Sequence, residues 1–458
     1  MDTIAAISTA PGIGGIGIIR LSGKNSFAIL DKIFKAKHPE EIENINGYTM
    51  KYGKIIDPKN NQIIDEVLVS YFKEPNSYTS ENVCEINSHG GMVIVKKILE
   101  LCLENGARLA EAGEFTKRAF LNGRLDLTQV EAVVDVINAK TEKESRASIN
   151  QLEGNLSREI KNIKNKILNI LTDIEASIDY PEYDIEEVSN NKALGTLEEV
   201  ENDLNELNKS FENGRIIKDG IKVAIIGKPN SGKSSLLNAI VKEERAIVTD
   251  IEGTTRDTIE EYISINGIPF KFIDTAGIRN AENKVEQIGI EKSKKVANES
   301  DLIVAMFDNS KELSDEDIDI LNFIKDKKSI ILLNKTDLGD KDLINSEQIK
   351  NTNKKALKIS LRSESNLKDF YNLLDNMFGL NEITADNEIL ITNVRHKKIV
   401  ENAINHVKNA KQDLKDGMPI DIISINIKSI LEDLAEITGE NVTEDIIKDI
   451  FSKFCLGK

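Results

Sequence analysis

The sequence predicts a multidomain protein of mixed α+β and α/β class, with a strand-rich amino-terminal domain, a helical domain, and an α/β domain inserted into the helical one. Its 458 residues are enough for about three domains. Short β-branched runs between Gly- and Asn-containing turns dominate Thr3 to Asn105. After Gly113, apolar residues recur at steps of three and four, a helical pattern that stops at Ile221 and returns near Asn387.

The composition limits the cellular compartment and the kinds of partner that we expect for the protein. Lys and Arg number 60 and Asp and Glu number 77, so the net charge is −17, which repels nucleic acids and anionic lipids at long range. The three cysteines form no CxxC pair, and neither a basic amino-terminal start nor an apolar run of about 18 residues is present. We therefore expect a cytoplasmic protein with no membrane or DNA partner, in which any RNA contact is local.

A glycine-rich segment near the amino terminus has two interpretations. Residues 12–17 have the GxGxxG spacing of dinucleotide-binding turns and follow a strand-like run, Thr3 to Ser8. Residues 18–21 (IIRL) are strand-like, however, and no acidic residue follows about 20 positions later at the end of a second strand. The glycines therefore predict a tight hairpin and not a dinucleotide site.

Two long amphipathic helices are predicted ahead of the α/β domain. They separate near Pro181, and Asn213-Gly214 predicts the end of the second. A last short helix near residue 450 is also apolar on one face. The residues that carry the three patterns are Ile160, Ile163, Ile167, Ile170, Ile174; Leu197, Val200, Leu204, Leu207, Phe211; and Ile446, Ile447, Ile450, Phe451, Phe454. We expect domains at 1–120, 121–214, 215–380 and 381–458, the second and fourth being the two parts of the helical domain.

A phosphate-binding loop follows the first strand of the α/β domain. Residues 221–226 (IKVAII) read as a buried parallel strand and lead into residues 227–234 (GKPNSGKS), which is GxxxxGKS at a strand-to-helix junction. Glycines let backbone N–H groups face the phosphates, the Lys233 ammonium neutralises β- and γ-phosphate charge, and the Ser234 hydroxyl ligates Mg²⁺. The loop residues expected to bind the nucleotide are Asn230, Ser231, Gly232, Lys233, Ser234 and Ser235.

Three further motifs follow in the order typical of GTP-hydrolysing proteins. Thr255, about 20 residues beyond the loop, is the candidate that completes the magnesium shell. Asp274 and Gly277 form a DxxG motif, in which the glycine amide senses the γ-phosphate. Asp337 ends an NKxD motif, and its carboxylate can accept the N1 and amino hydrogens of guanine, a pair that adenine lacks. The motifs predict an inserted P-loop, Ras-like G domain that hydrolyses GTP.

The hydrolytic machinery departs from the Ras-like pattern. Ile278 stands where a glutamine orients water in those proteins, and no arginine finger is evident. The amide oxygen of Asn230 could coordinate a monovalent cation that supplies the missing positive charge. The alternative is that Asn230 only braces the loop.

The chain ends in Cys455-Leu456-Gly457-Lys458, which resembles a prenylation box only superficially. Gly457 is not aliphatic, and lysine is a poor last residue for such a box. Cys455 is either a packed structural cysteine or a nucleophile with a lowered pKa, activated by the nearby ammonium. The residues alone leave both readings open.

Blocks in every part of the chain together resemble the MnmE (TrmE) family, and the match covers essentially the whole chain. A G domain inserted between helical halves is part of the match. The other blocks are residues 10–17 (APGIGGIG) with Arg20, residues 76–79 (NSYT), Glu85 ahead of residues 89–91 (HGG), residues 113–122 (GEFTKRAFLN), and the tail 454–458 (FCLGK).

The resemblance implies a GTP hydrolase that adds an aminomethyl-type (carboxymethylaminomethyl) group to carbon 5 of the wobble uridine of certain tRNAs. The one-carbon unit would come from 5,10-methylene- or 5-formyl-tetrahydrofolate bound to the strand-rich domain. The implied partners are a second copy of the chain and MnmG, with which it would form a heterotetramer, and FAD would enter only through MnmG. Potassium-dependent dimerisation of the G domains would drive the cycle.

The resemblance also implies roles for individual residues. Folate would contact Arg20, Glu85, Arg124 and Lys458, Cys455 would be the catalytic thiol, and Glu286 would position the attacking water. Potassium would lie among Asn230, Thr249, Ile251 and Thr254, and magnesium would bind Ser234 and Thr255. The further GTP-binding positions are Thr249, Asp250, Ile251, Glu252, Gly253, Thr254, Thr255, Asp274, Thr275, Ala276, Gly277, Asn334, Lys335, Asp337, Ser360, Leu361 and Arg362. Leu361 departs from the alanine usual at its position.

A second hypothesis is a GTP-dependent ribosome or RNA assembly factor without one-carbon chemistry. Cys455 and the amino-terminal folate block distinguish the two, because an assembly factor has no use for either. A free-standing folate-dependent aminomethyltransferase is disfavoured by the complete G domain.

Overall fold

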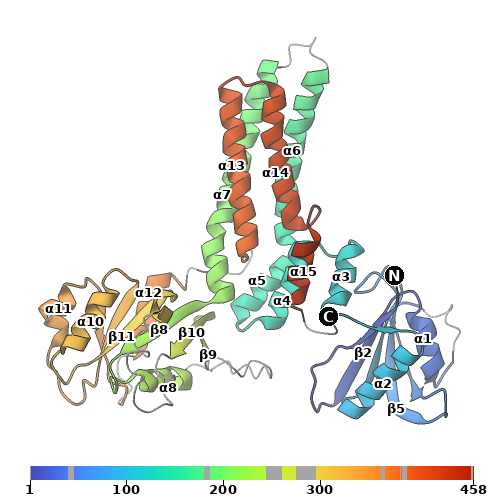
Figure 1. The fold of residues 1–458 in the computed structure, drawn as a ribbon, viewed down its shortest axis with the longest axis horizontal. Helices are drawn as coiled ribbons and strands as arrows, with labels where there is room; N and C mark the ends of the chain where they lie inside the picture. The colour runs from blue at the N-terminus through green and yellow to red at the C-terminus, as the bar shows by residue number, and fades with distance from the viewer. Residues whose placement is uncertain are drawn as a thin grey trace. The chain divides into compact units, whose positions relative to one another are not determined.

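The computed structural model describes residues 2–39, 46–179, 186–243, 260–274, 295–362, 367–381, 383, 389–454 and 457. The chain falls into two compact units (Figure 1). One comprises residues 1–134, 151–202 and 399–458, and the other comprises residues 135–150 and 203–398. Within the described ranges, none of the helices combines the length and apolarity needed to cross a membrane.

The amino-terminal part of the first unit contains a seven-stranded sheet of order β3-β4-β5-β6-β2-β1-β7. Neighbouring strands are antiparallel except β1 and β7, which are parallel. The strands are β1 Ile4–Ile7, β2 Ile16–Ser22, β3 Phe34–Ala36, β4 Thr49–Ile56, β5 Ile63–Phe72, β6 Val83–His89 and β7 Arg108–Leu109. The antiparallel pairing of β1 with β2 confirms the hairpin predicted from the glycine-rich segment.

One face of this sheet is covered by α1, Ser26–Ile33, and α2, Met92–Glu104 (Figure 1). Alternate strand residues point into the layer between sheet and helices. Ile19, Val69 and Ile86 from the strands and Leu30 and Ile98 from the helices are fully buried there. The opposite face carries the other set of alternate residues, including Arg20 and Glu85.

The helical part of the first unit begins after Gly113. It contains α3 Glu114–Leu121, α6 Asn155–Asp179, α14 Ile420–Thr438 and α15 Glu444–Ser452, with parts of α4 Leu127–Asn138, α5 Glu142–Leu152, α7 Glu186–Asp219 and α13 Val394–Lys415. Ile450, Phe451 and Phe454 pack against Leu127 and Val130 of α4, which confirms the predicted apolar face of the last helix. Figure 1 shows α6 and α14 lying side by side.

The predicted end of α7 at Asn213-Gly214 is wrong, because the helix continues to Asp219. Gly214 lies where an added Cβ would come within 2.2 Å of the Ile391 carbonyl oxygen, so its lack of a side chain permits a close backbone approach. The helix instead ends before Gly220, which has the left-handed φ of 75° typical of glycine after a helix.

The second unit is built on a six-stranded sheet of order β13-β12-β11-β8-β10-β9, parallel except for the β9–β10 hairpin. Its strands are β8 Ile221–Gly227, β9 Glu260–Ile265, β10 Ile268–Asp274, β11 Leu302–Asp308, β12 Ser329–Asn334 and β13 Lys355–Lys358. Its helices include α8 Lys233–Glu243, α10 Asp315–Ile324, α11 Glu347–Lys350 and α12 Leu367–Phe378, with a 3₁₀ turn at Leu343–Asn345.

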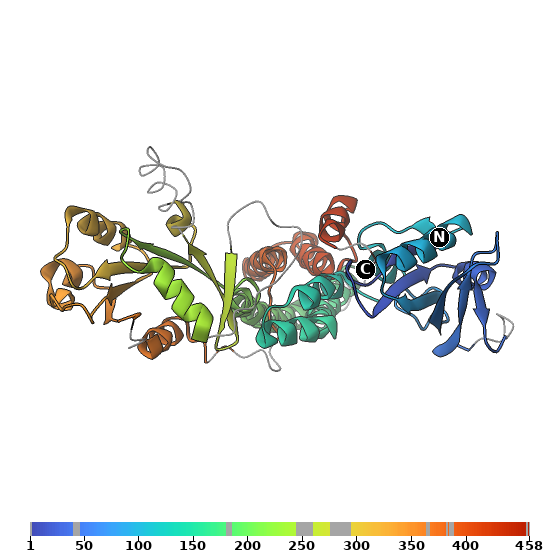
Figure 2. The same ribbon diagram turned by 90° about the horizontal axis from the view of Figure 1, so that it is seen from below.

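Helices cover both faces of this second sheet. On one face, Leu236 and Ile240 of α8 and Phe370 of α12 pack against Val223 and Phe270, and Figure 2 shows α8 lying along the strands. On the other face, Leu321 and Ile324 of α10 pack against strand residues such as Ile303 and Ile331. The arrangement is the predicted α/β fold with a strand-loop-helix at its centre.

A buried arginine of α3 forms an ion pair with the amino-terminal segment of the chain. The Arg118 side chain is 3% exposed, and its Nη2 lies 2.8 Å from Asp2 Oδ1 and 3.0 Å from Glu114 Oε1. Its Nη1 lies 3.1 Å from Glu81 Oε2. Arg108 also pairs with Asp2, at 2.7 Å. Hydrogen bonds from Arg108 and then Arg118 lower the pKa of Asp2 to about 2.

We predict that Asp2→Asn makes the protein less stable in a pH-dependent way. A carboxyl whose pKa is lower in the folded state stabilises the fold above its ordinary pKa, 3.8 here, and loses this effect as the pH falls toward 2. The melting temperature of the variant should be lower than that of the wild-type protein at about pH 5 to 7. The difference between the two melting temperatures should shrink in acid. Asp31→Asn, at an exposed position of α1, is the control in calorimetry. A difference independent of pH would contradict the assignment.

Candidate functional sites

The nucleotide motifs meet at one edge of the second sheet. The parallel strands β8, β10, β11 and β12 end there at Gly227, Asp274, Asp308 and Asn334. Since ligands of open α/β sheets bind beyond the carboxyl ends of the strands, this edge is the candidate nucleotide site.

The phosphate loop curls around the Lys233 ammonium. Lys233 Nζ donates hydrogen bonds of 2.7 Å to the Gly227 carbonyl and 2.8 Å to the Lys228 carbonyl. Ser231 N–H also donates to the Lys228 carbonyl, at 3.2 Å. Asn230, exposed at the tip of the loop, has a left-handed φ of 63°. Lys233 begins α8, so the loop leads directly into the amino terminus of a helix, which suits phosphate binding.

Asn334 joins the phosphate loop to the loop after β13. Its Nδ2 donates 2.9 Å to the Ser231 carbonyl, and its Oδ1 accepts from Leu361 N–H at 3.3 Å. Gly232 makes this contact possible, because an added Cβ there would lie 2.2 Å from Asn334 Nδ2. The buried amide therefore holds two nucleotide-facing loops at a fixed spacing.

Asp337 and Lys335 are also fixed by neighbours at this edge. Ser360 Oγ donates 2.7 Å to Asp337 Oδ1, which orients the carboxylate expected to bind guanine. Lys335 Nζ lies 2.8 Å from Asp308 Oδ2. Burial raises the pKa of Asp308, but hydrogen bonds from Lys335 and Ser310 outweigh it, so the pKa lies below its ordinary value. Asp308 is therefore ionised at neutral pH.

The sequence did not predict the side-chain contacts that hold the phosphate loop against α10. Lys228 Nζ lies 2.7 Å from Ser314 Oγ and 2.7 Å from Asp317 Oδ2. Ser314 and Asp317 form the capping box of α10, so the first turn of that helix anchors the loop. The Ser-x-x-Asp spacing was the available signal, but nothing in the sequence pairs it with Lys228.

Several predicted residues lie outside the described part of the chain. They are Thr249, Asp250, Ile251, Glu252, Gly253, Thr254, Thr255, Thr275, Ala276, Gly277, Glu286, Cys455 and Lys458. Ser234 and Ser235 are exposed in the first turn of α8, and Arg362 is exposed after Leu361. The described residues contain no group of three or more His, Cys, Asp or Glu side chains arranged to hold a metal ion.

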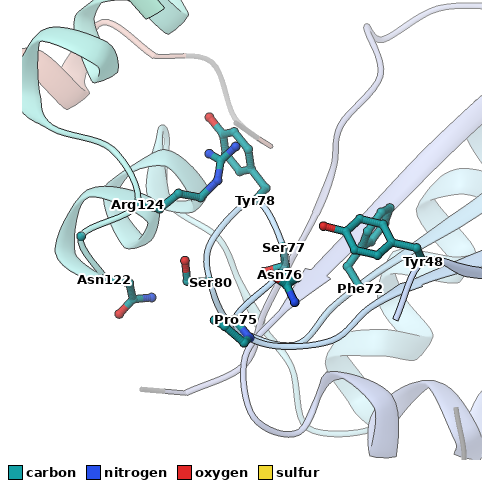
Figure 3. Close-up of a pocket in the computed structure, with 10 residues that line it drawn as sticks. Tyr48, Phe72, Pro75, Asn76, Ser77, Tyr78, Ser80, Asn122 and Arg124 are labelled. Atoms are coloured by element: carbon teal, nitrogen blue, oxygen red, sulfur yellow. The ribbon is translucent and has the colours of Figure 1, made fainter. Parts of the chain in front are cut away.

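Two predicted folate residues, Arg20 and Arg124, contact Tyr78 in the first unit, and a third, Glu85, pairs with Arg20. Arg20 and Glu85 are cross-strand neighbours on β2 and β6, and Arg20 Nε lies 2.8 Å from Glu85 Oε1. The guanidinium carbon of Arg20 lies 5.6 Å from the ring centres of Tyr78 and Phe115, and that of Arg124 lies 5.0 Å from Tyr78. Figure 3 shows Arg124 against the Tyr78 ring. Sequence reasoning missed the role of Tyr78, although it lies within the quoted NSYT block.

A pocket of about 560 Å³ adjoins this cluster (Figure 3). Its lining is aromatic and polar and includes Tyr48, Phe72, Asn76, Tyr78, Asn122 and Arg124. Guanidinium groups bind carboxylates, and aromatic rings stack on flat heterocycles. The pocket therefore suits a flat heteroaromatic ligand with an acidic tail.

The carboxy-terminal tail reaches the same sheet. Ser8 Oγ donates 3.1 Å to the Gly457 carbonyl, and an added Cβ on Gly457 would lie 2.1 Å from the Ile7 carbonyl oxygen. The two described cysteines are unsuited to nucleophilic chemistry, because burial raises the pKa of Cys84 and raises that of Cys102 to about 12. Any reactive thiol near this sheet therefore has to be one outside the described residues.

We predict that Asn334→Ala weakens binding of GTP and GDP alike, by about tenfold or more. Both loops lose their shared partner, and unpaired buried groups cost about 1–3 kcal/mol. Titration of a fluorescent guanine nucleotide measures the effect. Asn322→Ala, at an exposed position of α10, is the control. Unchanged affinity in Asn334→Ala would show that the link between the loops is dispensable.

Known families and proteins resemble this chain over nearly its whole length. A family model described as the MnmE helical domain matches residues 127–455, and one described as the GTP-binding protein TrmE N-terminus matches residues 3–124. Proteins named tRNA modification GTPase MnmE are 50% identical in Acetivibrio thermocellus and 48% identical in Alkaliphilus oremlandii, each over 457 residues. The one in Clostridioides difficile is 49% identical over 459 residues. Each alignment covers 100% of this chain and 99% of the relative. The chain belongs to the MnmE family and is a GTPase.

Proposed function

We propose that the protein uses GTP hydrolysis to drive modification of the wobble uridine of tRNA at carbon 5, with a reduced folate as carbon donor. The observation that carries the proposal is the gathering of Arg20, Glu85 and Arg124 around Tyr78, beside an aromatic pocket. A GTPase that acts only as an assembly factor has no need of such a pocket. The relatives named tRNA modification GTPase MnmE supply the substrate class.

The cluster fits the chemistry of a reduced folate. Glu85, oriented by its ion pair with Arg20, would accept hydrogen bonds from the amino group and ring N–H of its pterin, and the Arg124 guanidinium would meet a glutamate carboxylate of its tail. The bound folate would supply a one-carbon unit. In the proposed complex, Tyr78 keeps both guanidinium groups in place.

The first test is reconstitution of the full cycle. We expect the protein with its FAD-dependent partner MnmG, methylene-tetrahydrofolate, NADH, GTP and unmodified tRNA to yield an aminomethyl-type uridine, read by nucleoside mass spectrometry. Tyr78→Leu should lower the yield and the affinity for folate, because both arginines lose their aromatic contact, which is worth about 0.5–2 kcal/mol each. An unmodified uridine with the wild-type chain would instead favour the assembly-factor alternative.

Magnesium and potassium are proposed as cofactors of the G domain. Ser234 is exposed in the first turn of α8, and its hydroxyl suits Mg²⁺, which prefers oxygen ligands. The exposed side chain of Asn230 stands on a left-handed backbone at the tip of the phosphate loop, where its amide oxygen could bind a monovalent cation. A cation held there would stabilise negative charge that develops on the phosphates. Its binding would also favour pairing of two G domains on GTP.

We predict that the protein hydrolyses GTP faster in potassium than in sodium, and that Asn230→Ala removes the difference. The amide oxygen is the ligand lost, so kcat should fall by about ten- to a thousandfold, as when a transition-state stabiliser is removed. Asn351→Ala, at an exposed site of the same domain, is the control. Equal rates of the wild-type protein in both salts would contradict the cation proposal.

A further inference from the structure

His89 is the last residue of β6 and the first of the HGG block, to which no role has been assigned so far. It pairs with Asp65 of β5. Asp65 Oδ1 lies 2.7 Å from His89 Nδ1, and Asp65 Oδ2 accepts the His89 backbone N–H at 2.8 Å. The Asp65 side chain is 8% exposed, whereas the His89 ring is 70% exposed. Among the described residues, none makes a hydrogen bond to Nε2 of His89.

This arrangement is the one in which histidine transfers protons. A carboxylate that holds Nδ1–H fixes the tautomer, leaves Nε2 as the acceptor, and stabilises the imidazolium that forms. The second bond, to the backbone, anchors Asp65 to the residue that it orients.

The register of the sheet places His89 on the same strand as the folate candidate Glu85. The two residues are four apart on β6, which is about 14 Å along the strand. On the neighbouring strand β2, Arg20 pairs with Glu85 and Ile16 pairs with His89. A substrate that lies along β2 can reach both.

Ser8, at the end of β1, joins Gly457 to the middle of this stretch of β2. Ser8 N–H donates 2.8 Å to the Ile18 carbonyl, and Ser8 Oγ donates 3.1 Å to the Gly457 carbonyl. Ile18 lies midway between Arg20 and Ile16 along the strand. The Arg20–Glu85 pair, Ser8 and His89 therefore lie along residues 16–20 of β2, and Gly457 reaches this stretch only through Ser8.

The glycine-rich segment also abuts this end of β6. An added Cβ on Gly90 would lie 2.3 Å from the Gly14 carbonyl oxygen, so the chain before β2 packs directly against the residue that follows His89. Ile16, Gly14 and Gly90 also line a second pocket of about 340 Å³. The residue after His89 thus lines a cavity and contacts a second chain segment.

We propose that His89, oriented by Asp65, is the general base that removes the proton from carbon 5 of the target uridine. The inference rests on the proposed function. The C5=C6 π electrons of the uracil ring would form the bond from carbon 5 to the one-carbon unit of the folate, whose C=N π electrons would move to nitrogen, and carbon 6 would be left electron-deficient. The C5–H bond then breaks, its electron pair restores the ring double bond, and the proton passes to Nε2. Asp65 offsets the charge of the imidazolium.

The experiment measures tritium released to water from tRNA that carries 5-³H-uridine. It uses the full chain with its FAD-dependent partner, methylene-tetrahydrofolate and GTP. His89→Ala should release tritium roughly 100-fold more slowly than wild type, the usual effect of losing a general base. GTP hydrolysis and folate affinity should not change. Added imidazole should restore part of the rate, because the position is exposed, and Asp65→Asn should show an intermediate rate.

His38→Ala is the matched control, because His38 is exposed on the same domain and has no carboxylate partner among the described residues. Tritium release by His89→Ala at the wild-type rate would overturn the role of His89. A slow rate that imidazole does not restore would also overturn it, since a structural defect cannot be repaired by a free base. Failure of the wild-type protein to release tritium would overturn the proposed function itself, and this outcome is distinct from the other two.

Discussion

The antiparallel register of β2 with β6 is the constraint on which the candidate modification site depends. It sets Arg20 opposite Glu85 and Ile16 opposite His89, and it leaves Ile18 between them to pair with Ser8, which holds the tail. A shift of one residue would turn Arg20 into the apolar core and Ile19 out of it. The burial of Ile19 and Ile86 beneath α1 and α2 thus fixes the polar face as firmly as the core.

The G domain meets a different constraint, because its site is assembled from loops and not from a sheet face. Parallel strands bring the loops to one edge, but their spacing is set by side chains that bridge them. Asn334 links the phosphate loop to the loop after β13, and Lys228 links the phosphate loop to α10. Both bridges involve buried partners, where polar contacts are strongest and their loss is most costly.

Much of the fold and of the nucleotide site could be predicted from the sequence, since their signals are local. Consecutive or periodic residues predict the strand 221–226, the loop that follows it, and the apolar face of the last helix. The end of α7 could not be predicted, because the role of Gly214 depends on Ile391, far away in the chain. Tyr78, Lys228 and the Asp65–His89 pair were missed for the same reason: each acts through a partner that only the folded chain brings near.

In the proposed function, reduced folate is the source of the carbon added to uridine, and isotope tracing tests this most directly. Methylene-tetrahydrofolate labelled with ¹³C in its one-carbon unit is supplied to the reconstituted system, and the modified nucleoside is analysed by mass spectrometry. We predict one ¹³C atom in every newly modified uridine, attached to carbon 5. A modified uridine that lacks the label would contradict this role of folate.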